Sequence, residues 1–326
     1  MTLTLNDVAK EAGVTVTTVS RVLNNRGSIS DKTREKVYQA MDKLNYVPNE
    51  MARSLSKQKA SIIGIIVPSV KNPFFAEVTE SLEKYAYENG YKILLCNSYH
   101  EPEKEKDYIN MMKSNKVAGL VISSRTKGID QYLNGNFPVV SFERIISEKC
   151  SSVTCDNYEG GKLAAQHLID SGCRNLICIT GDSSLHMAAN NRAIAFEDYC
   201  KSKSIPCQVF VTQEAEFQSM DYLNSLERIV QNHPDADGYF TTGDIIAMQL
   251  IKICKKHHIN VPDNAKIVGF DDTYIATYSD PPLTTIHQPI DTMCKFAIDT
   301  ILHYDSNNQT PIRSSLGVTL IKRGTT

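Results

Sequence analysis

The sequence predicts an α/β protein with a small all-helical head and a large two-lobed body of parallel sheets. Three observations lead to this fold class. Residues 5–24 have the pattern of two short amphipathic helices joined by a tight turn. From Ser61 onward, short apolar runs alternate with amphipathic stretches, which indicates βα units whose sheets are covered on both faces. About 265 residues follow this pattern, too many for one compact core, so we expect two similar lobes with a cleft between them.

The head begins with a pattern typical of a helix-turn-helix motif. Thr4 and Asp7 have the Ser/Thr-x-x-acid spacing that starts a helix. Gly13 lies in the turn, where glycine tolerates a positive φ, and Thr15 is placed to cap the second helix. The outward side chains of that helix are small, hydroxylated or basic, so they can approach phosphates and base edges without repulsion. They are Val16, Thr17, Thr18, Ser20 and Arg21. An ordinary helical hairpin is the alternative.

A third helix is expected over residues 31–44, because its apolar side chains recur every three or four positions. Residues 1–47 then form one helical domain. Residues 48–59 follow as a linker in which Asn49 could cap two helical turns. A helix that short is marginal in water because nucleation is costly. We therefore expect this segment to become ordered only when something packs on it, and a plain flexible linker is the alternative.

Charge and cysteine content narrow the class of protein. Residues 1–59 carry a net charge of +4 and the rest of the chain −6. A basic head on an acidic body suits a DNA-binding module attached to a different kind of domain. The nine cysteines include no Cys-x-x-Cys pair, so we expect small buried hydrophobic side chains in a reducing compartment. No secretion signal and no apolar run of about 18 residues occurs, so we expect a cytoplasmic protein without a membrane partner.

The body, residues 60–326, is expected to divide into two lobes. Lobe 1 would hold about residues 60–157 and 289–326, including the end of the chain, and lobe 2 about residues 158–288. Strands are expected at residues 62–67, 91–96, 119–123, 139–142, 176–180, 209–212, 238–241, 267–270 and 318–321. Helices are expected at residues 74–89, 101–114, 158–170, 193–201, 220–231, 244–257 and 290–302.

Several motifs, in order from about residue 3 to about residue 323, resemble the lactose/galactose repressor (LacI/GalR) family. Besides the head motif they are Tyr46-Val47-Pro48-Asn49, Ala52-Arg53, Leu55, Gly64-Ile65, Asn72-Pro73-Phe74-Phe75, Asp156-Asn157, Gly160, Arg192, residues 269–272 and residues 282–288. Residues 48–55, 96–98 and 270–274 look most like those of sucrose-operon repressors of Gram-positive bacteria.

The resemblance implies a homodimer, or a tetramer, that binds palindromic operator DNA. By position, Val16, Thr17 and Arg21 match the family's base-reading residues. Arginine can pair bidentately with guanine, although a phosphate contact is the alternative for Arg21. Leu55 would enter the minor groove at the operator centre. The expected DNA-binding residues are Thr4, Val16, Thr17, Thr18, Ser20, Arg21, Asn24, Asn49, Ala52 and Leu55.

The resemblance also implies a type I periplasmic-binding-protein-like body that holds an effector between its lobes. Candidate residues follow strand ends, where α/β sheets bind ligands. They are Phe74, Phe75, Glu143, Arg144, Asn157, Arg192, Asp244, Asp271 and Gln288. Their polar groups can bind adjacent hydroxyls, and a phenylalanine ring can stack on a sugar. A neutral sugar such as fructose is therefore expected, with a monophosphate ester or a nucleobase as alternatives. Phe74 or Phe75 could instead belong to the core, and Asp244 could cap a helix.

The expected function is that of a repressor of a sucrose-type sugar operon, switched by the sugar. Three residues depart from the family pattern, so no particular sugar carries over: Pro68, Glu143 and Gly243. An enzyme is not expected, because the dinucleotide, P-loop and nucleophile-elbow motifs are absent and the eight histidines have no metal-ligand spacing; neither a cofactor nor a metal is expected. The remaining alternatives are a global carbon regulator with a protein co-regulator and a sugar-binding protein without a DNA role.

Overall fold

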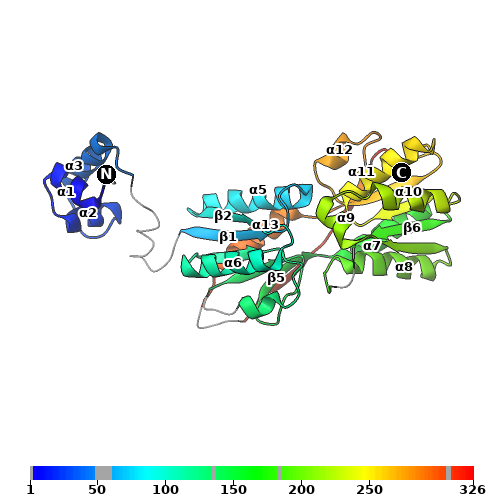
Figure 1. Ribbon diagram of the computed structural model, residues 1–326, viewed down its shortest axis with the longest axis horizontal. Coiled ribbons are helices and arrows are strands. Elements are labelled where there is room, and N and C mark those ends of the chain that lie inside the picture. The colour runs from blue at the N-terminus through cyan, green and yellow to red at the C-terminus, as the bar shows by residue number, and fades with distance from the viewer. Residues whose placement is uncertain (1–2, 48–60, 134–136, 183–184, 306–309) are drawn as a thin grey trace. The chain divides into compact units, whose positions relative to one another are not determined.

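The computed structural model describes residues 3–47, 61–133, 137–182, 185–305 and 310–326. The chain divides into two compact units, residues 1–60 and residues 61–326, shown in Figure 1. The linker expected at residues 48–59, with Asn49, Ala52 and Leu55, lies outside the described residues. Within the described part of the chain, no helix combines the length and apolar character needed to cross a bilayer.

The head is a bundle of α1 (Leu5–Ala12), α2 (Val16–Leu23) and α3 (Asp31–Leu44), at the positions that the sequence predicts. The capping groups expected for the first two helices are engaged. The N–H and the hydroxyl of Thr4 donate to Asp7 Oδ2 at 2.8 and 2.7 Å, and Thr15 Oγ1 accepts from the Thr18 N–H at 3.2 Å. Gly13 ends α1 with a φ of 67°. The buried side chains of the bundle are Val8, Ala9, Val19, Val22, Val37 and Ala40.

The body contains two six-stranded sheets. The strands of lobe 1 are β1 (Ile62–Val67), β2 (Lys92–Asn97), β3 (Gly119–Ile122), β4 (Val139–Phe142), β5 (Ser151–Cys155) and β11 (Arg313–Leu316). They are all parallel, in the order β11-β5-β4-β3-β1-β2. The strands of lobe 2 are β6 (Leu176–Thr180), β7 (Cys207–Val211), β8 (Gly238–Thr241), β9 (Lys266–Asp271), β10 (Thr284–His287) and β12 (Thr319–Ile321). Their order is β12-β10-β9-β8-β6-β7.

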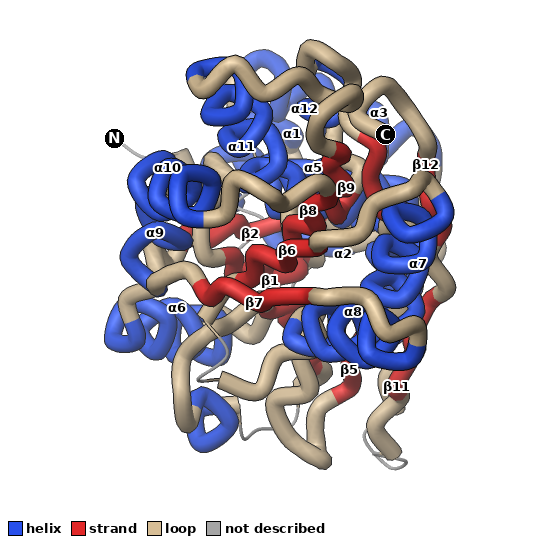
Figure 2. The backbone as a smooth tube through the Cα atoms, turned by 90° about the vertical axis from the view of Figure 1, so that its right-hand side faces the viewer, coloured by secondary structure: helices blue, strands red, loops and turns tan. Residues whose placement is uncertain are grey.

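Helices cover both faces of each sheet. In lobe 1, α5 (Pro73–Glu88) and α13 (Ile290–Leu302) pack on one face, and α6 (Pro102–Ser114) with the 3-10 turn η1 (Ile129–Tyr132) packs on the other. In lobe 2, α7 (Asn157–Asp170) and α8 (Asn190–Ser202) lie opposite α10 (Leu223–Asn232) and α11 (Asp244–Lys256), as Figure 2 shows. The short helices α9 (Glu214–Ser219) and α12 (Ile275–Tyr278) complete lobe 2. The buried faces of the helices supply the apolar contacts that a sheet covered on both faces requires.

The end of the chain corrects the expectation that residues 289–326 all belong to lobe 1. Helix α13 and strand β11 do belong there, but the chain then crosses between the lobes a third time. Strand β12 pairs antiparallel with β10 in lobe 2, and the buried Thr325 hydroxyl donates to the Ile267 carbonyl at 2.7 Å. A three-residue edge strand is too short to show a regular alternation of apolar and polar residues. Its sequence therefore does not indicate which sheet it joins, and only pairing with a distant strand decides this.

The expected helix over residues 220–231 is also corrected. The helix begins three residues later than predicted, as α10 at Leu223, and a separate helix, α9, precedes it. Met220 ends α9 in a left-handed conformation with a φ of 56°. Gln213 is the N-cap of α9, and its N–H donates to Glu216 Oε2 at 2.8 Å. This capping pattern lies upstream of the stretch in which helical periodicity is visible. Lobe 2 therefore gains a short helix that faces the cleft described below.

Candidate functional site

The outer face of α2 is the part of the head suited to DNA. Val16, Thr17 and Arg21 are exposed, and Thr18 and Ser20 are half-buried. The Thr18 hydroxyl is hydrogen-bonded to Thr15 Oγ1 at 2.9 Å, within the helix cap. Three of the five predicted side chains therefore project freely from the face, and one is engaged in holding the helix start.

Two other predicted DNA-binding residues have structural partners in the head. Thr4 caps α1 through its bonds to Asp7. Asn24 Nδ2 donates to the Ser20 carbonyl at 2.9 Å and so closes the end of α2. These contacts fix the length and orientation of the two helices. They leave the exposed residues of α2 as the candidates for base contacts.

A cleft between the two lobes holds about 1080 Å³ of empty space, open solvent at its mouth included. Its lining comes from the carboxyl ends of the strands in both sheets and from the helices that follow them. Six of the nine predicted effector residues line it: Phe74, Phe75, Glu143, Arg192, Asp244 and Asp271.

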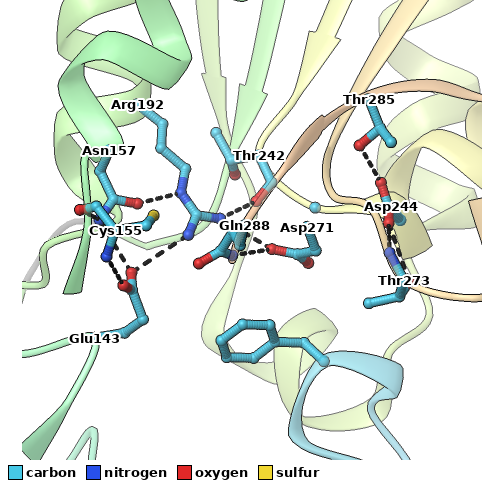
Figure 3. Close-up of polar contacts among 12 residues, drawn as sticks. Glu143, Cys155, Asn157, Arg192, Thr242, Asp244, Asp271, Thr273, Thr285 and Gln288 are labelled. Atoms are coloured by element: carbon cyan, nitrogen blue, oxygen red, sulfur yellow. Dashed lines mark hydrogen bonds and ion pairs between the residues drawn. The ribbon is translucent and has the colours of Figure 1, made fainter. Parts of the chain in front are cut away.

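Arg192 is the centre of the polar network in Figure 3. Its Nε donates to Asn157 Oδ1 at 2.6 Å, and its Nη1 donates to the Thr242 carbonyl at 2.9 Å. Nη2 is 3.4 Å from Glu143 Oε2, and Nη1 is 3.4 Å from Asp271 Oδ1. The guanidinium also lies 3.6 Å from the centroid of the Phe270 ring. A side chain with this many partners is held in one orientation.

The close packing of α7 against α8 determines the position of Arg192. Helices α7 and α8 approach so closely at Gly161 that a Cβ there would lie 2.0 Å from the Arg192 carbonyl oxygen. A Cβ at the neighbouring Gly160 would lie 2.6 Å from the Phe270 ring, on which the guanidinium rests. The two glycines therefore set the position of α8, and with it the arginine, relative to the cleft.

Glu143, after β4 of lobe 1, and Asn157, at the start of α7, form one side of the network. Glu143 Oε1 accepts from the Cys155 N–H at 2.6 Å, and Oε2 accepts from Asn157 Nδ2 at 3.0 Å. Glu143 has a φ of 57°, a conformation that a glutamate rarely adopts. Backbone strain of this kind is concentrated at functional sites. Asn157 does not line the cleft itself; it holds the two residues that do.

Asp271 and Gln288 form the lobe 2 side. Gln288 Nε2 donates to Asp271 Oδ1 at 2.6 Å, and Gln288 is buried behind the cleft wall. Asp271 has a φ of 115°, well outside the regions that non-glycine residues favour. Burial raises the pKa of Asp271 to about 7, although Arg192 and the Gln288 amide act in the opposite direction.

Asp244 lines the cleft, but its oxygens are occupied within its own lobe. Oδ2 accepts from the N–H and the hydroxyl of Thr273 at 2.8 and 3.0 Å, and Oδ1 accepts from the Thr285 hydroxyl at 2.6 Å. Burial raises the pKa of Asp244 well above its usual range. It does not cap α11, since Gly243 holds the N-cap position. Asp244 braces the cleft wall rather than offering a free acceptor.

Arg144 does not line the cleft, whereas the two phenylalanines do. Arg144 Nη1 donates to the Ser124 and Thr126 carbonyls at 2.9 and 3.0 Å, outside the cleft lining. It fixes the loop after β3. Phe74 is buried in the core of lobe 1 and also lines the cleft. The ring of the half-buried Phe75 packs edge-on against that of Phe74, with 5.2 Å between the ring centroids.

A second group of residues joins the two lobes away from the strands that carry the three crossings, and two of its members, Arg125 and Phe217, line the cleft. Arg125, after β3, donates through Nη2 to Glu214 Oε2 at 3.0 Å and to the Asp182 carbonyl at 3.3 Å. Its guanidinium lies 4.7 Å from the centroid of Phe217. We call Arg125, Glu214 and Phe217 the interlobe clasp. None of the three is predicted from the sequence, because residues 213–219 lie ahead of the predicted helix and no motif marks Arg125.

The comparisons with known proteins bear on both units. Residues 4–49 match the model of bacterial regulatory proteins of the lacI family, and residues 165–326 match that of periplasmic binding protein-like domains. The sucrose operon repressor of Pediococcus pentosaceus is 36% identical over 321 residues, which cover 98% of both chains.

The chain belongs to the LacI family of bacterial regulatory proteins. Another relative, the ribose operon repressor of Bacillus subtilis, is also 36% identical, over 299 residues that cover 92% of this chain and 90% of that one. The lac repressor dimer bound to operator and the anti-inducer ONPF superposes with a TM-score of 0.85 over 100% of this chain and 99% of that one, at 24% identity. The last similarity shows that the LacI-family fold extends over the whole chain.

The raised pKa of Asp271 gives this LacI-family body a testable pH dependence. An aspartate with a folded-state pKa of about 7 and an ordinary value of 3.8 binds its proton more tightly when folded. The stability that this proton provides is present at low pH and lost as pH rises through about 7. We expect wild type to lose more stability than Asp271→Asn between pH 5 and pH 8, measured by urea unfolding. Equal losses in the two proteins would contradict the assignment.

Proposed function

We propose that this protein is a DNA-binding repressor of a sugar-utilisation operon of the sucrose type, switched by a neutral sugar in the cleft. One observation carries the proposal: a head with an exposed, non-acidic second helix shares a chain with a cleft in which one buried arginine lies between two carboxyl groups. The relatives named above are operon repressors for two different sugars at equal identity. The choice of sugar therefore has to come from the cleft.

The charges in the cleft favour a neutral ligand. Among its described lining residues there are two arginines and no lysine. Arg192 lies between Glu143 and Asp271, and Arg125 is paired with Glu214. A phosphate ester would have to compete with these carboxylates for each guanidinium. Hydroxyl groups, in contrast, can add to such a network as both donors and acceptors.

The proposed mechanism is a difference in affinity between two arrangements of the lobes. A sugar that favours one arrangement changes the spacing of the two linkers in a homodimer, and with it the fit of both heads to a palindromic operator. Couplings of this kind are typically about 1–3 kcal/mol, and operator must change sugar affinity by the same factor.

The decisive experiment is a titration. Operator fragments are first selected from sheared source DNA with the full chain, and their affinity is then measured against increasing fructose, sucrose, ribose and a sugar monophosphate. We expect a neutral sugar to change operator affinity by about 5- to 150-fold. Selection of no specific fragment would refute DNA recognition. Affinity that none of the compounds alters would refute the sugar switch.

Arg21 provides the test of base reading in the head. Arg21→Ala is expected to weaken operator binding by about 1–3 kcal/mol per half-site and to relax the preference at one base pair in each. A phosphate contact would instead weaken all sequences alike and reduce the salt dependence. Lys10→Ala, an exposed basic residue of α1, is the matched charge control. Binding to a set of single-base operator variants distinguishes the outcomes.

The interlobe clasp is expected to slow ligand release, because it joins the lobes at the side of the cleft away from the crossings. Glu214→Gln keeps the shape of the side chain and removes its charge. We expect the sugar to dissociate about three- to tenfold faster, as for loss of one partly exposed charged hydrogen bond. Glu227→Gln, whose pair with Lys256 lies within lobe 2, is the control. Stopped-flow dissociation that is identical in both variants would contradict the role of the clasp.

A further inference from the structure

Gly243 has no conformational or packing reason to be glycine. Its φ of −172° and ψ of 146° are extended values that any residue adopts. A Cβ built there meets, within 4 Å of the described atoms, only Asp271 Oδ2, at 3.7 Å. At Gly269, in contrast, a Cβ would lie 2.6 Å from Asp244 Oδ1. Gly243 also starts α11 without a side-chain cap, where serine or asparagine favours the helix. The fold therefore tolerates a side chain at this position.

The space over Gly243 adjoins an unused acceptor. Asp271 Oδ1 receives hydrogen bonds from Gln288 at 2.6 Å and from Arg192 at 3.4 Å. Among the described residues, none donates to Asp271 Oδ2, the oxygen that the Cβ at position 243 would meet. Both oxygens of Glu143, on the opposite wall, accept bonds from the protein. The carboxylate oxygen beside Gly243 is thus open to a donor from the cleft.

Bond geometry shows what fits there. When a hydroxyl donates to a carboxylate at a normal distance, the carbon that carries the hydroxyl lies roughly 3.6 Å from the acceptor oxygen. That is the separation at which a Cβ of residue 243 would stand from Asp271 Oδ2. A hydroxyl-bearing ligand carbon that approaches Oδ2 from the side of Gly243 would therefore occupy the space that a side chain at position 243 would fill. An exocyclic hydroxymethyl group carries its hydroxyl on a carbon outside the sugar ring, so it is the sugar substituent that matches a single Cβ and its hydroxyl.

We propose that Gly243 forms a subsite for the hydroxymethyl branch of the sugar, whose hydroxyl donates to Asp271 Oδ2. This inference rests on the proposed sugar binding and names the residue that makes the cleft select sugars with that branch. A serine at position 243 would fill the subsite and present its own hydroxyl to Asp271. The variant would then resemble a permanently occupied subsite.

The test compares sugars that differ by one hydroxymethyl group. The probes are D-fructose with D-xylulose, whose furanose ring keeps the hydroxymethyl group at C2 but lacks the one that fructofuranose carries at C5, and D-glucose with D-xylose, whose pyranose ring lacks the hydroxymethyl group at C5. Binding to the full chain is measured by calorimetry for wild type and Gly243→Ser. We expect Gly243→Ser to weaken binding of the hydroxymethyl sugar by roughly tenfold or more and to change its truncated partner less than about threefold. The melting temperature of the variant should not fall.

Gly181→Ser is the matched control, because Gly181 also lines the cleft and has open space where its Cβ would be. Gly181→Ser should leave the ratio of the affinities for the two sugars of a pair as it is in wild type. The subsite would be refuted if Gly243→Ser left this affinity ratio unchanged, or if Gly181→Ser lowered it as much as Gly243→Ser does. Either result would leave the proposed sugar binding intact. If wild type bound neither sugar of either pair, the subsite and the proposed sugar effector would fall together.

Discussion

A chain that begins at Ser61 is expected to bind operator at least about a thousand-fold more weakly than the full protein, while it binds sugar unchanged. The reason is the division of the molecule into two compact units. The exposed face of α2 belongs to the first unit, and the whole cleft lining belongs to the second. Specific DNA binding typically exceeds non-specific binding by about 10³-fold or more, and the truncated chain would lose even the basic head that supports non-specific binding.

The measurement is a gel-shift titration with the selected operator, paired with calorimetry of sugar binding. Light scattering on both chains is the control, because loss of self-association would also weaken operator binding. A truncated chain of unchanged assembly that still bound operator tightly would place DNA recognition in the body. A truncated chain that no longer bound sugar would show that the head contributes to the cleft.

The parts of the fold that sequence alone predicts are those with local signals. The three helices of the head have caps, a turn glycine and regular apolar spacing, and they begin and end at the predicted residues. Buried parallel strands such as β1 and β3 are continuous runs of apolar residues and glycine, which is typical of sheets covered on both faces. The edge strand β11 has no such signal and is not predicted. A strand is expected at residues 318–321, where β12 lies, but its pairing with lobe 2 is not, because only distant segments bring the two strands together.

Prediction from local sequence signals has the same limit for the residues of the cleft. Strand-end positions identified six lining residues, because the carboxyl ends of parallel strands meet at one edge of a sheet. Three further predicted residues, Arg144, Asn157 and Gln288, lie behind the lining and bond to it or to its loops. Whether a polar side chain reaches the cleft or supports a neighbour depends on partners far along the chain. No spacing within a single sequence reveals that difference.

Arg192→Met is expected to destabilise the body by about 3–5 kcal/mol and to abolish sugar binding. The substitution keeps an unbranched apolar side chain of similar reach but removes the guanidinium, of which 6% is exposed. Glu143 and Asp271 would then be buried carboxylates without their cation, and removal of one member of a buried ion pair carries a cost of this size. The contact with the Phe270 ring would be lost as well. Arg228→Met, on the exposed face of α10, should change stability by less than about 0.5 kcal/mol.

The pH dependence of the stability lost in Arg192→Met distinguishes an uncompensated charge from a packing defect. The guanidinium lowers the pKa of Asp271, so its removal must raise that pKa further. The folded variant then keeps its proton above about pH 7, where folded wild type has lost it, so the stability of the variant goes on falling at pH values where that of wild type has levelled off. The difference between wild type and Arg192→Met in urea unfolding should therefore grow from pH 5 to pH 8. A constant difference would mean that the arginine acts through shape alone, because a lost packing contact does not titrate.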